Sequence, residues 1–258
     1  MRLSILLLFA VLLHCPAALA GDRPLVLFDQ GHDQRFVIEQ EGALHLSRMA
    51  GIFETKGATV VPGEEKLTPA MLKNAAVLVV SGPFSPFSPA EIDAIVNWLF
   101  EGGRLALMLH IPMPVTDLLA RLDVFASNGV IQEHNNLLAG NDRDFLVVDL
   151  DTHPVLNGIE GFAVYGCWAL LNAGDRVRII ARTSPAAWVD LNRDHVQDKT
   201  DPSQALGTMA SGSFGKGRYL IVGDDAVFQN RFLEGNNRRL AENLADWLLR
   251  PTGGNAGN

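Results

Sequence analysis

Cysteine is scarce in this chain, and that scarcity limits how the fold can be held together. Only two cysteines occur among 258 residues, Cys15 and Cys167. Cys15 falls within an apolar N-terminal segment that we expect to be removed, and one remaining thiol cannot form an intramolecular disulfide. Stability must therefore come from a hydrophobic core, which a chain of this length and 48% hydrophobic content can bury. We expect Cys167 to be a buried packing residue.

Runs of basic residues are also absent. The chain has 21 Lys and Arg against 29 Asp and Glu, which gives a net charge of −8, and no cluster of Lys or Arg stands out. Because phosphate contacts need basic patches, the sequence excludes nucleic acid as a partner. Anionic membrane surfaces are disfavoured for the same reason. Cations and neutral ligands fit this charge better.

Beyond the N-terminus the chain lacks any apolar run long enough to cross a bilayer. The N-terminal run, "LSILLLFAVLLHCPAALA", follows an arginine and ends in a small-x-small triplet, which predicts a secretory signal peptide over residues 1–20, cleaved after Ala20. A membrane anchor is the alternative, but His14 and Pro16 interrupt the run. Lipidation at Cys15 is a second alternative, disfavoured because a bulky His14 precedes it. We therefore predict a periplasmic or secreted protein that does not span the membrane after cleavage.

What the mature chain does have is an alternation of short apolar runs and helical patterns. All-apolar runs of this length are typical of buried strands in a parallel sheet, and their alternation with helices predicts a βαβ architecture with a flavodoxin-like order. The predicted strands are 25–28, 58–61, 76–80 and 104–110, and the predicted helices are 43–57, 67–74 and 88–102.

Helix boundaries carry recognisable local signals. Gly57 is expected to end the first helix. Thr68 is placed to cap the second, with Pro69 at its first helical position. Ser88 and Glu91 have the spacing of a capping box at the start of the third helix.

The pattern becomes richer in strands after Asn128. Strands are predicted at 145–151, 177–184, 186–191 and 217–225, and a closing helix at 236–250. No linker divides the chain, so we predict one domain over residues 21–250. The Gly- and Asn-rich tail, residues 251–258, is expected to be disordered.

Two stretches, "FDQGHDQRF" and "LVVSGPFSPFSPAEIDAIVNWLFEGGRLALML", carry a family resemblance. They resemble the domain shared by an intraflagellar-transport subunit and the bacterial gliding-motility ABC-system accessory proteins (the GIFT-type domain), which is related in fold to the class I glutamine amidotransferases. The C-terminal stretch "GKGRYLIVGDDAVFQNRFLEGNNRRLAENLADWL" is similar to the endings of uncharacterised exported bacterial proteins of this fold. The resemblance implies a flavodoxin-like, amidotransferase-like parallel sheet with helices on both faces, followed here by a more β-rich C-terminal part.

The resemblance also implies where a nucleophile would be. Amidotransferase-like enzymes keep a Cys or Ser on the turn after the strand that matches "RLALMLH". Here the chain has His110, Ile111 and Pro112 at that turn, which provide neither thiol nor hydroxyl. Neither a Gly-x-Ser-x-Gly nor a His-Glu-x-x-His motif occurs anywhere in the sequence. We therefore predict no catalytic residues and a non-enzymatic role.

Polar residues gather where the predicted strands end. Because ligands of open parallel sheets bind beyond the carboxyl ends of the strands, these residues form a predicted rim that suits a metal or sugar hydroxyls. Two alternatives remain open: the acids are ordinary helix caps, or Asp29, His32, His110 and Asp224 form the site of a hydrolase. The predicted ligand-binding residues are Asp29, Gly31, His32, Ser81, Gly82, His110, Asp224 and Asp225.

A Pro-rich loop, "SGPFSPFSP", contains two phenylalanines. Phe84 and Phe87 either form a contact surface for a partner or fold back onto the core.

The stretch "DLNRDHVQDKTD", residues 190–201, has the ligand spacing of an EF-hand-like calcium loop. Two departures are His195 at the sixth place, where Gly is usual, and Asp201 at the twelfth, where Glu is usual. The alternative is a solvated acidic turn. If calcium binds, we expect it to stabilise the loop and take no part in chemistry. The predicted ligands are Asp190, Asn192, Asp194, Asp198 and Asp201, with the Val196 carbonyl.

Taken together, these features predict an exported, non-catalytic binding or scaffold module of the cell envelope, with calcium as its only expected cofactor. The expected partner is an envelope protein or a saccharide.

Overall fold

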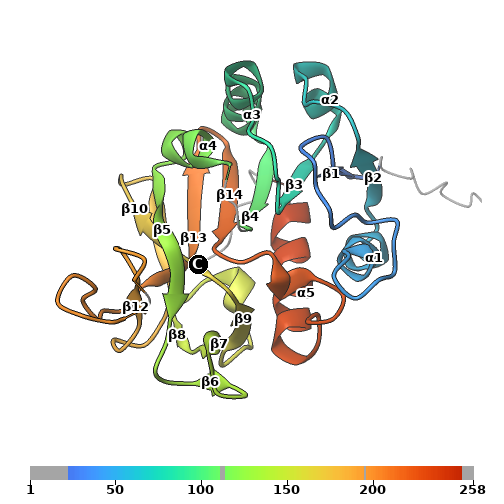
Figure 1. The fold of residues 1–258 in the computed structure, drawn as a ribbon. Coiled ribbons are helices and arrows are strands. Elements are labelled where there is room, and N and C mark those ends of the chain that lie inside the picture. Colours follow the sequence, from blue (N-terminus) through green and yellow to red (C-terminus); the bar gives the residue numbers. More distant parts are fainter. Residues whose placement is uncertain (1–22, 111–113, 195, 252–258) are drawn as a thin grey trace, which may run out of the picture.

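The computed structural model describes residues 23–110, 114–194 and 196–251. The predicted signal peptide and nearly all of the predicted tail lie outside these residues, as do Ile111, Pro112 and His195. The described residues form an eleven-stranded sheet and a separate three-stranded sheet, together with five α-helices (Figure 1). None of the helices in these ranges is long and apolar enough to cross a bilayer.

One half of the large sheet is parallel and follows the order β2-β1-β3-β4-β14. This is the 2-1-3-4-5 order of flavodoxin-like sheets, with β14 as the fifth strand. Each of these strands matches an apolar run that the sequence predicts. Their bounds are β1 Leu25–Asp29, β2 Thr59–Gly63, β3 Val77–Ser81, β4 Arg104–Met108 and β14 Gly217–Val222.

The local signals correctly predict where α2 and α3 begin. The Thr68 side chain accepts a hydrogen bond at the start of α2, and Ser88 and Glu91 form a complete capping box on α3. Gly57, at a φ of 86°, follows the end of α1. α1 is shorter than the predicted 43–57. The helices are α1 Ser47–Thr55, α2 Pro69–Asn74, α3 Pro89–Glu101, α4 Thr116–Arg121 and α5 Gly235–Leu249.

The other half of the sheet is antiparallel and continues from β14 through β13, β10, β5 and β12, with β11 and β8 paired beside β13. The sequence predicts β11, β12 and β14 but misses β13, β10 and β5. These strands are β5 Val124–Gln132, β8 Asp149–Leu150, β10 Trp168–Asn172, β11 Val177–Arg182, β12 Trp188–Val189 and β13 Gly207–Phe214.

The small sheet, drawn at the bottom of Figure 1, has the order β6-β7-β9. The single strand predicted over 145–151 is wrong: Val148 interrupts it, β7 ends in the small sheet, and β8 pairs with β11 in the large one. Two short 3₁₀ turns complete the fold. The bounds are β6 Leu137–Leu138, β7 Asn141–Val147, β9 Phe162–Tyr165, η1 Pro154–Leu156 and η2 Ala226–Phe228.

Side chains of the central strands alternate between two hydrophobic cores, as the period of a strand requires. In β1, Phe28 packs into the core that contains α1 and α5, while Leu27 packs into the core that contains α2, α3 and α4. Figure 1 shows α1 beside α5 and α2 beside α3. Cys167 is fully buried in the first core, as predicted.

Candidate ligand site

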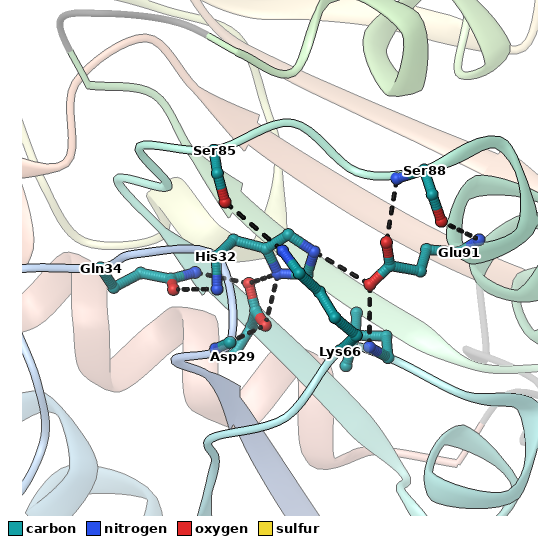
Figure 2. Close-up of polar contacts among 9 residues, drawn as sticks. Asp29, His32, Gln34, Lys66, Ser85, Ser88 and Glu91 are labelled. Carbon is teal, nitrogen blue, oxygen red and sulfur yellow. Dashed lines mark hydrogen bonds and ion pairs between the residues drawn. The ribbon is translucent and has the colours of Figure 1, made fainter.

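The rim predicted from the strand ends divides into two separate clusters. In the first, the His32 ring lies between two carboxylates (Figure 2). Its Nδ1 is 2.9 Å from both oxygens of Asp29, and its Nε2 is 3.0 Å from Oε1 of Glu91. The ring also packs against Phe87, with centroids 3.8 Å apart and 35° between the ring planes. We name Asp29, His32 and Glu91 the buried brace.

Both ring nitrogens of His32 therefore contact carboxylate oxygens, one from the last residue of β1 and one from the first turn of α3. Glu91 receives further donors, the backbone N–H groups of Leu67 and Ser88, each at 2.9 Å. Burial alone raises the pKa of the Glu91 carboxyl, but the Ser88 hydrogen bonds, the charge of His32 and the Leu67 N–H together lower it. A buried ring whose two nitrogens both contact carboxylates links the loop after β1 to the start of α3.

The buried brace occupies the place where a flavodoxin-like sheet usually holds its ligand. That place is the switch in strand order between β1 and β3. His32 is fully buried there, and its carbonyl accepts hydrogen bonds from the Phe84 and Ser85 N–H groups. Gly31 is needed because a Cβ would collide with the Glu65 carbonyl. Gly31 and His32 therefore hold the loop after β1 against the loops that contain Glu65 and Phe84.

The second cluster lies at the ends of β4 and β14. Nδ1 of His110 is 2.8 Å from Oδ1 of Asp225, and Nε2 of His110 has no hydrogen-bond partner within the described ranges. The Asp225 side chain is buried, whereas the His110 side chain is 26% exposed. Burial lowers the pKa of His110, but the hydrogen bond and charge of Asp225, with the charge of Asp224, outweigh it and raise this pKa overall.

Asp224 is the most strongly perturbed acid of this cluster. Its carboxylate accepts hydrogen bonds from the Tyr165 N–H of β9 and from the Ala226 N–H at the start of η2. The second bond spans two residues, as in an Asx turn, whereas the N-cap residue of η2, Asp225, makes no side-chain cap hydrogen bond. Complete burial and the neighbouring charge of Asp225 raise the pKa of Asp224 to about 7.

A small pocket opens beside this cluster. Its volume is about 140 Å³, and its lining includes Phe36, His110, Tyr165, Asp224, Asp225 and Gln229. Two aromatic rings flank the imidazole: the centroids of Phe36 and Phe84 lie 5.4 and 5.0 Å from that of His110. Phe84 thus contacts the site, whereas Phe87 is buried in the core. We name this the His110 pocket.

Gly82 makes the His110–Asp225 pair possible. Its φ is 54°, and a Cβ there would lie 2.5 Å from Oδ2 of Asp225 and 3.2 Å from Cβ of His110. Only glycine combines that backbone conformation with so close an approach. Ser81, also predicted for the rim, is buried, and its hydroxyl has no hydrogen-bond partner among the described residues.

The thiol of Cys167 is not available to the imidazole as a nucleophile. The Cys167 thiol is fully buried and donates to the Trp168 carbonyl at 3.3 Å, and burial together with the charge of Asp224 raises its pKa well above the ordinary value. A thiol in that state is inert.

The acidic loop brings together three of its four predicted aspartate ligands. Carboxylate oxygens of Asp190, Asp194 and Asp201 lie within 4.8 Å of one another. Asp198 is not among these three, and its carboxylate accepts hydrogen bonds from the Thr200 N–H and hydroxyl, each at 2.7 Å. Asn192 donates its amide to Asp194 at 3.0 Å.

Comparison with known proteins gives a family but no activity. Residues 46–245 match the family described as a domain of unknown function (DUF4350), and the chain belongs to it. None of the curated proteins compared with the chain matches it.

Solved structures show the fold. The mmIFT52 N-terminal domain is similar with a TM-score of 0.69 at 14% identity, covering 91% of this chain and 100% of that one. A ThuA-like protein from Parabacteroides merdae ATCC 43184 has a TM-score of 0.53 at 10% identity, covering 88% and 90%. At these identities the likeness concerns the fold alone. It agrees with a mixed α/β architecture of flavodoxin-like strand order.

Proposed function

We propose that the chain is a non-catalytic binding module of the cell envelope that takes a saccharide in the His110 pocket. In this proposal the protein is exported, and its fold is the amidotransferase-like, GIFT-type arrangement with helices on both faces of the sheet. The observation that carries it is a pocket with aromatic walls and a polar floor at the ends of β4 and β14.

The chemistry of the lining favours a neutral, hydroxyl-rich ligand. Phe36 and Tyr165 provide flat apolar surfaces, while His110, Asp224 and Gln229 provide hydrogen-bonding groups. Small-molecule sites commonly combine an apolar wall with a few such polar groups. Hydroxyl groups suit this lining because they both donate to a carboxylate and accept from an imidazole N–H.

Calorimetric titration with a panel of mono- and oligosaccharides tests this function. We expect saturable binding that is weakened at least about tenfold by His110→Ala, the loss of one charge-assisted hydrogen bond. The Phe100→Ala variant, which changes an exposed aromatic ring elsewhere, is the control. Absence of binding across the panel would contradict the proposal.

Export is tested separately by N-terminal sequencing of the protein recovered from bacterial periplasm. The mature protein should begin at Gly21.

A hydrolase is the second candidate, favoured by one feature. Asp225 orients His110 through Nδ1 and leaves Nε2 without a described partner, which is the arrangement of a general base and its orienting acid. Such a pair would activate a water molecule in place of a side-chain nucleophile. Turnover of 4-nitrophenyl glycosides or esters that disappears in His110→Gln would favour this candidate over the binding module.

We further propose that the acidic loop binds calcium and that the ion has a structural role. The convergence of Asp190, Asp194 and Asp201 supports this, because calcium takes several oxygen ligands around one point.

A further inference from the structure

A second pocket adjoins the His110 pocket and has Tyr165 as a shared wall. Its volume is about 290 Å³, and its lining includes Ala163, Arg231, Phe232, Glu234 and Asn236. The His110 pocket, at about 140 Å³, is smaller than the roughly 300–1,000 Å³ of typical ligand pockets. The two pockets taken together fall inside that range.

The wall between the pockets is aromatic and firmly held. The Tyr165 ring stacks on Phe232, with centroids 3.9 Å apart and 24° between the ring planes. The Arg231 guanidinium lies over Phe232 at 5.4 Å. The Tyr165 backbone N–H also donates to Asp224, so the wall is fixed to the floor of the His110 pocket.

Tyr165 presents its hydroxyl without an internal partner. The phenol forms no hydrogen bond with other residues that the structure describes. Burial and the charges of Asp144 and Asp224 raise its pKa, so the hydroxyl stays protonated and can donate. A phenol donor between two pockets suits a ligand oxygen that lies between two rings.

The second pocket also has polar groups suited to hydroxyls. Asn236 donates through its amide nitrogen to the Gly161 carbonyl at 2.7 Å, which leaves its amide oxygen available as an acceptor. Arg231 and Glu234 are exposed at the pocket's rim and add a donor and an acceptor. Asn237, by contrast, uses both ends of its amide on Ala163.

From this arrangement we infer that the ligand is an oligosaccharide of at least two rings, with one ring in each pocket and the linkage beside Tyr165. The inference rests on the proposed function and adds to it a second subsite. Phe232 is then a specificity-determining residue that favours a disaccharide over its monosaccharide, while Phe36 contacts the ring common to both.

The test compares matched ligands and matched variants by calorimetry. Glucose is paired with cellobiose and maltose, and N-acetylglucosamine with its β-1,4-linked dimer. We expect at least one disaccharide to bind about tenfold more tightly than its monosaccharide. Phe232→Ala should remove that advantage and leave monosaccharide affinity unchanged, while Phe36→Ala should weaken both ligands.

Each outcome decides between the two proposals. Equal affinity for monosaccharide and disaccharide, or an equal effect of Phe232→Ala on both, would overturn the second subsite and leave the proposed function standing. Failure of every sugar to bind would overturn both. Phe232→Leu, which keeps apolar bulk but removes the stacking ring, should reproduce the result if Phe232→Ala does not fold.

Discussion

Nδ1 of His110 and Oδ1 of Asp225 lie 2.8 Å apart although the two residues are 115 positions apart in the sequence. The adjacency of β4 and β14 brings them together, because residues that follow neighbouring parallel strands emerge at the same edge of the sheet. The pair turns two separate strand ends into one site.

Replacing Asp225 by Asn should lower the pKa of His110. The aspartate hydrogen bond and charge hold this pKa above its ordinary value, so their removal leaves the lowering effect of burial. Titration of the His110 ring by NMR measures the change. The pair's contribution to stability is full below the unfolded pKa of about 6.5 and is lost as pH rises through the folded pKa. A titration unchanged from wild type would contradict this assignment.

Asp224 should make the protein less stable as the pH rises toward neutrality. Its pKa in the folded state is about 7, above the ordinary value of 3.8, so the folded state binds the proton more tightly than the unfolded chain does. Stability from this group is therefore full below about pH 4 and is lost between that pH and about 7. Asp224→Asn loses a backbone hydrogen bond at every pH, but its deficit in melting temperature should shrink from pH 5 to pH 7.5. A deficit independent of pH would contradict the raised pKa.

Breaking the buried brace should be strongly destabilising. His32→Ala leaves Asp29 and Glu91 as buried carboxylates without their shared partner, and such changes cost about 3–5 kcal/mol. Urea unfolding measures this loss. The matched control is Lys66→Ala nearby, which removes an exposed 3.4 Å contact with Ser85 and should change stability by less than about 0.5 kcal/mol. Similar losses in both variants would show that the brace does not carry the stability assigned to it.

Gly82→Ala should disturb the His110–Asp225 pair, because the new methyl group requires the Asp225 carboxylate to move and strains the backbone. We expect a loss of about 1–3 kcal/mol and weaker ligand binding. Gly51→Ala provides the opposite control: it lies in α1 with open space around it and should stabilise the protein by about 0.5–1 kcal/mol. Thermal melting of both variants should therefore shift in opposite directions.

Calcium should raise the melting temperature. At a concentration about one hundred times Kd, binding adds about 2.7 kcal/mol, which for a domain of this size is about 5–10 °C. Asp201→Asn should abolish the response to calcium and chelator. Asp198→Asn should retain it, because the Asp198 carboxylate is engaged by Thr200. A melting temperature indifferent to calcium would identify the loop as a solvated acidic turn.

The sequence predicts the elements whose signals are local. Ser88, Pro89 and Glu91 define the start of α3 within four residues, and the all-apolar runs of β1, β3 and β4 reflect burial on both faces. β13 is missed because "GTMASGSF" is small and polar, and its place in the sheet comes from pairing with β11 and β14. Tertiary context decides such strands.

The sequence predicts only part of the site, because tertiary contacts decide which strand ends come together. Strand ends identify Asp29, His32, His110 and Asp225, but only the fold shows that they form two clusters. Glu91 is missed as a partner of His32 because its sequence context signals a helix cap, and 59 residues separate the two. Tyr165 is missed because it reaches the pocket from the small sheet, whose position no local pattern specifies.

One connection links the two clusters. The His32 carbonyl accepts hydrogen bonds from the loop that carries Phe84, and Phe84 packs on His110. His32, which occupies the crevice between β1 and β3, therefore also sets the position of the Phe84 ring beside the His110 pocket. Selection for altered ligand preference should accordingly recover substitutions around His32, which acts on the pocket through the backbone of Phe84.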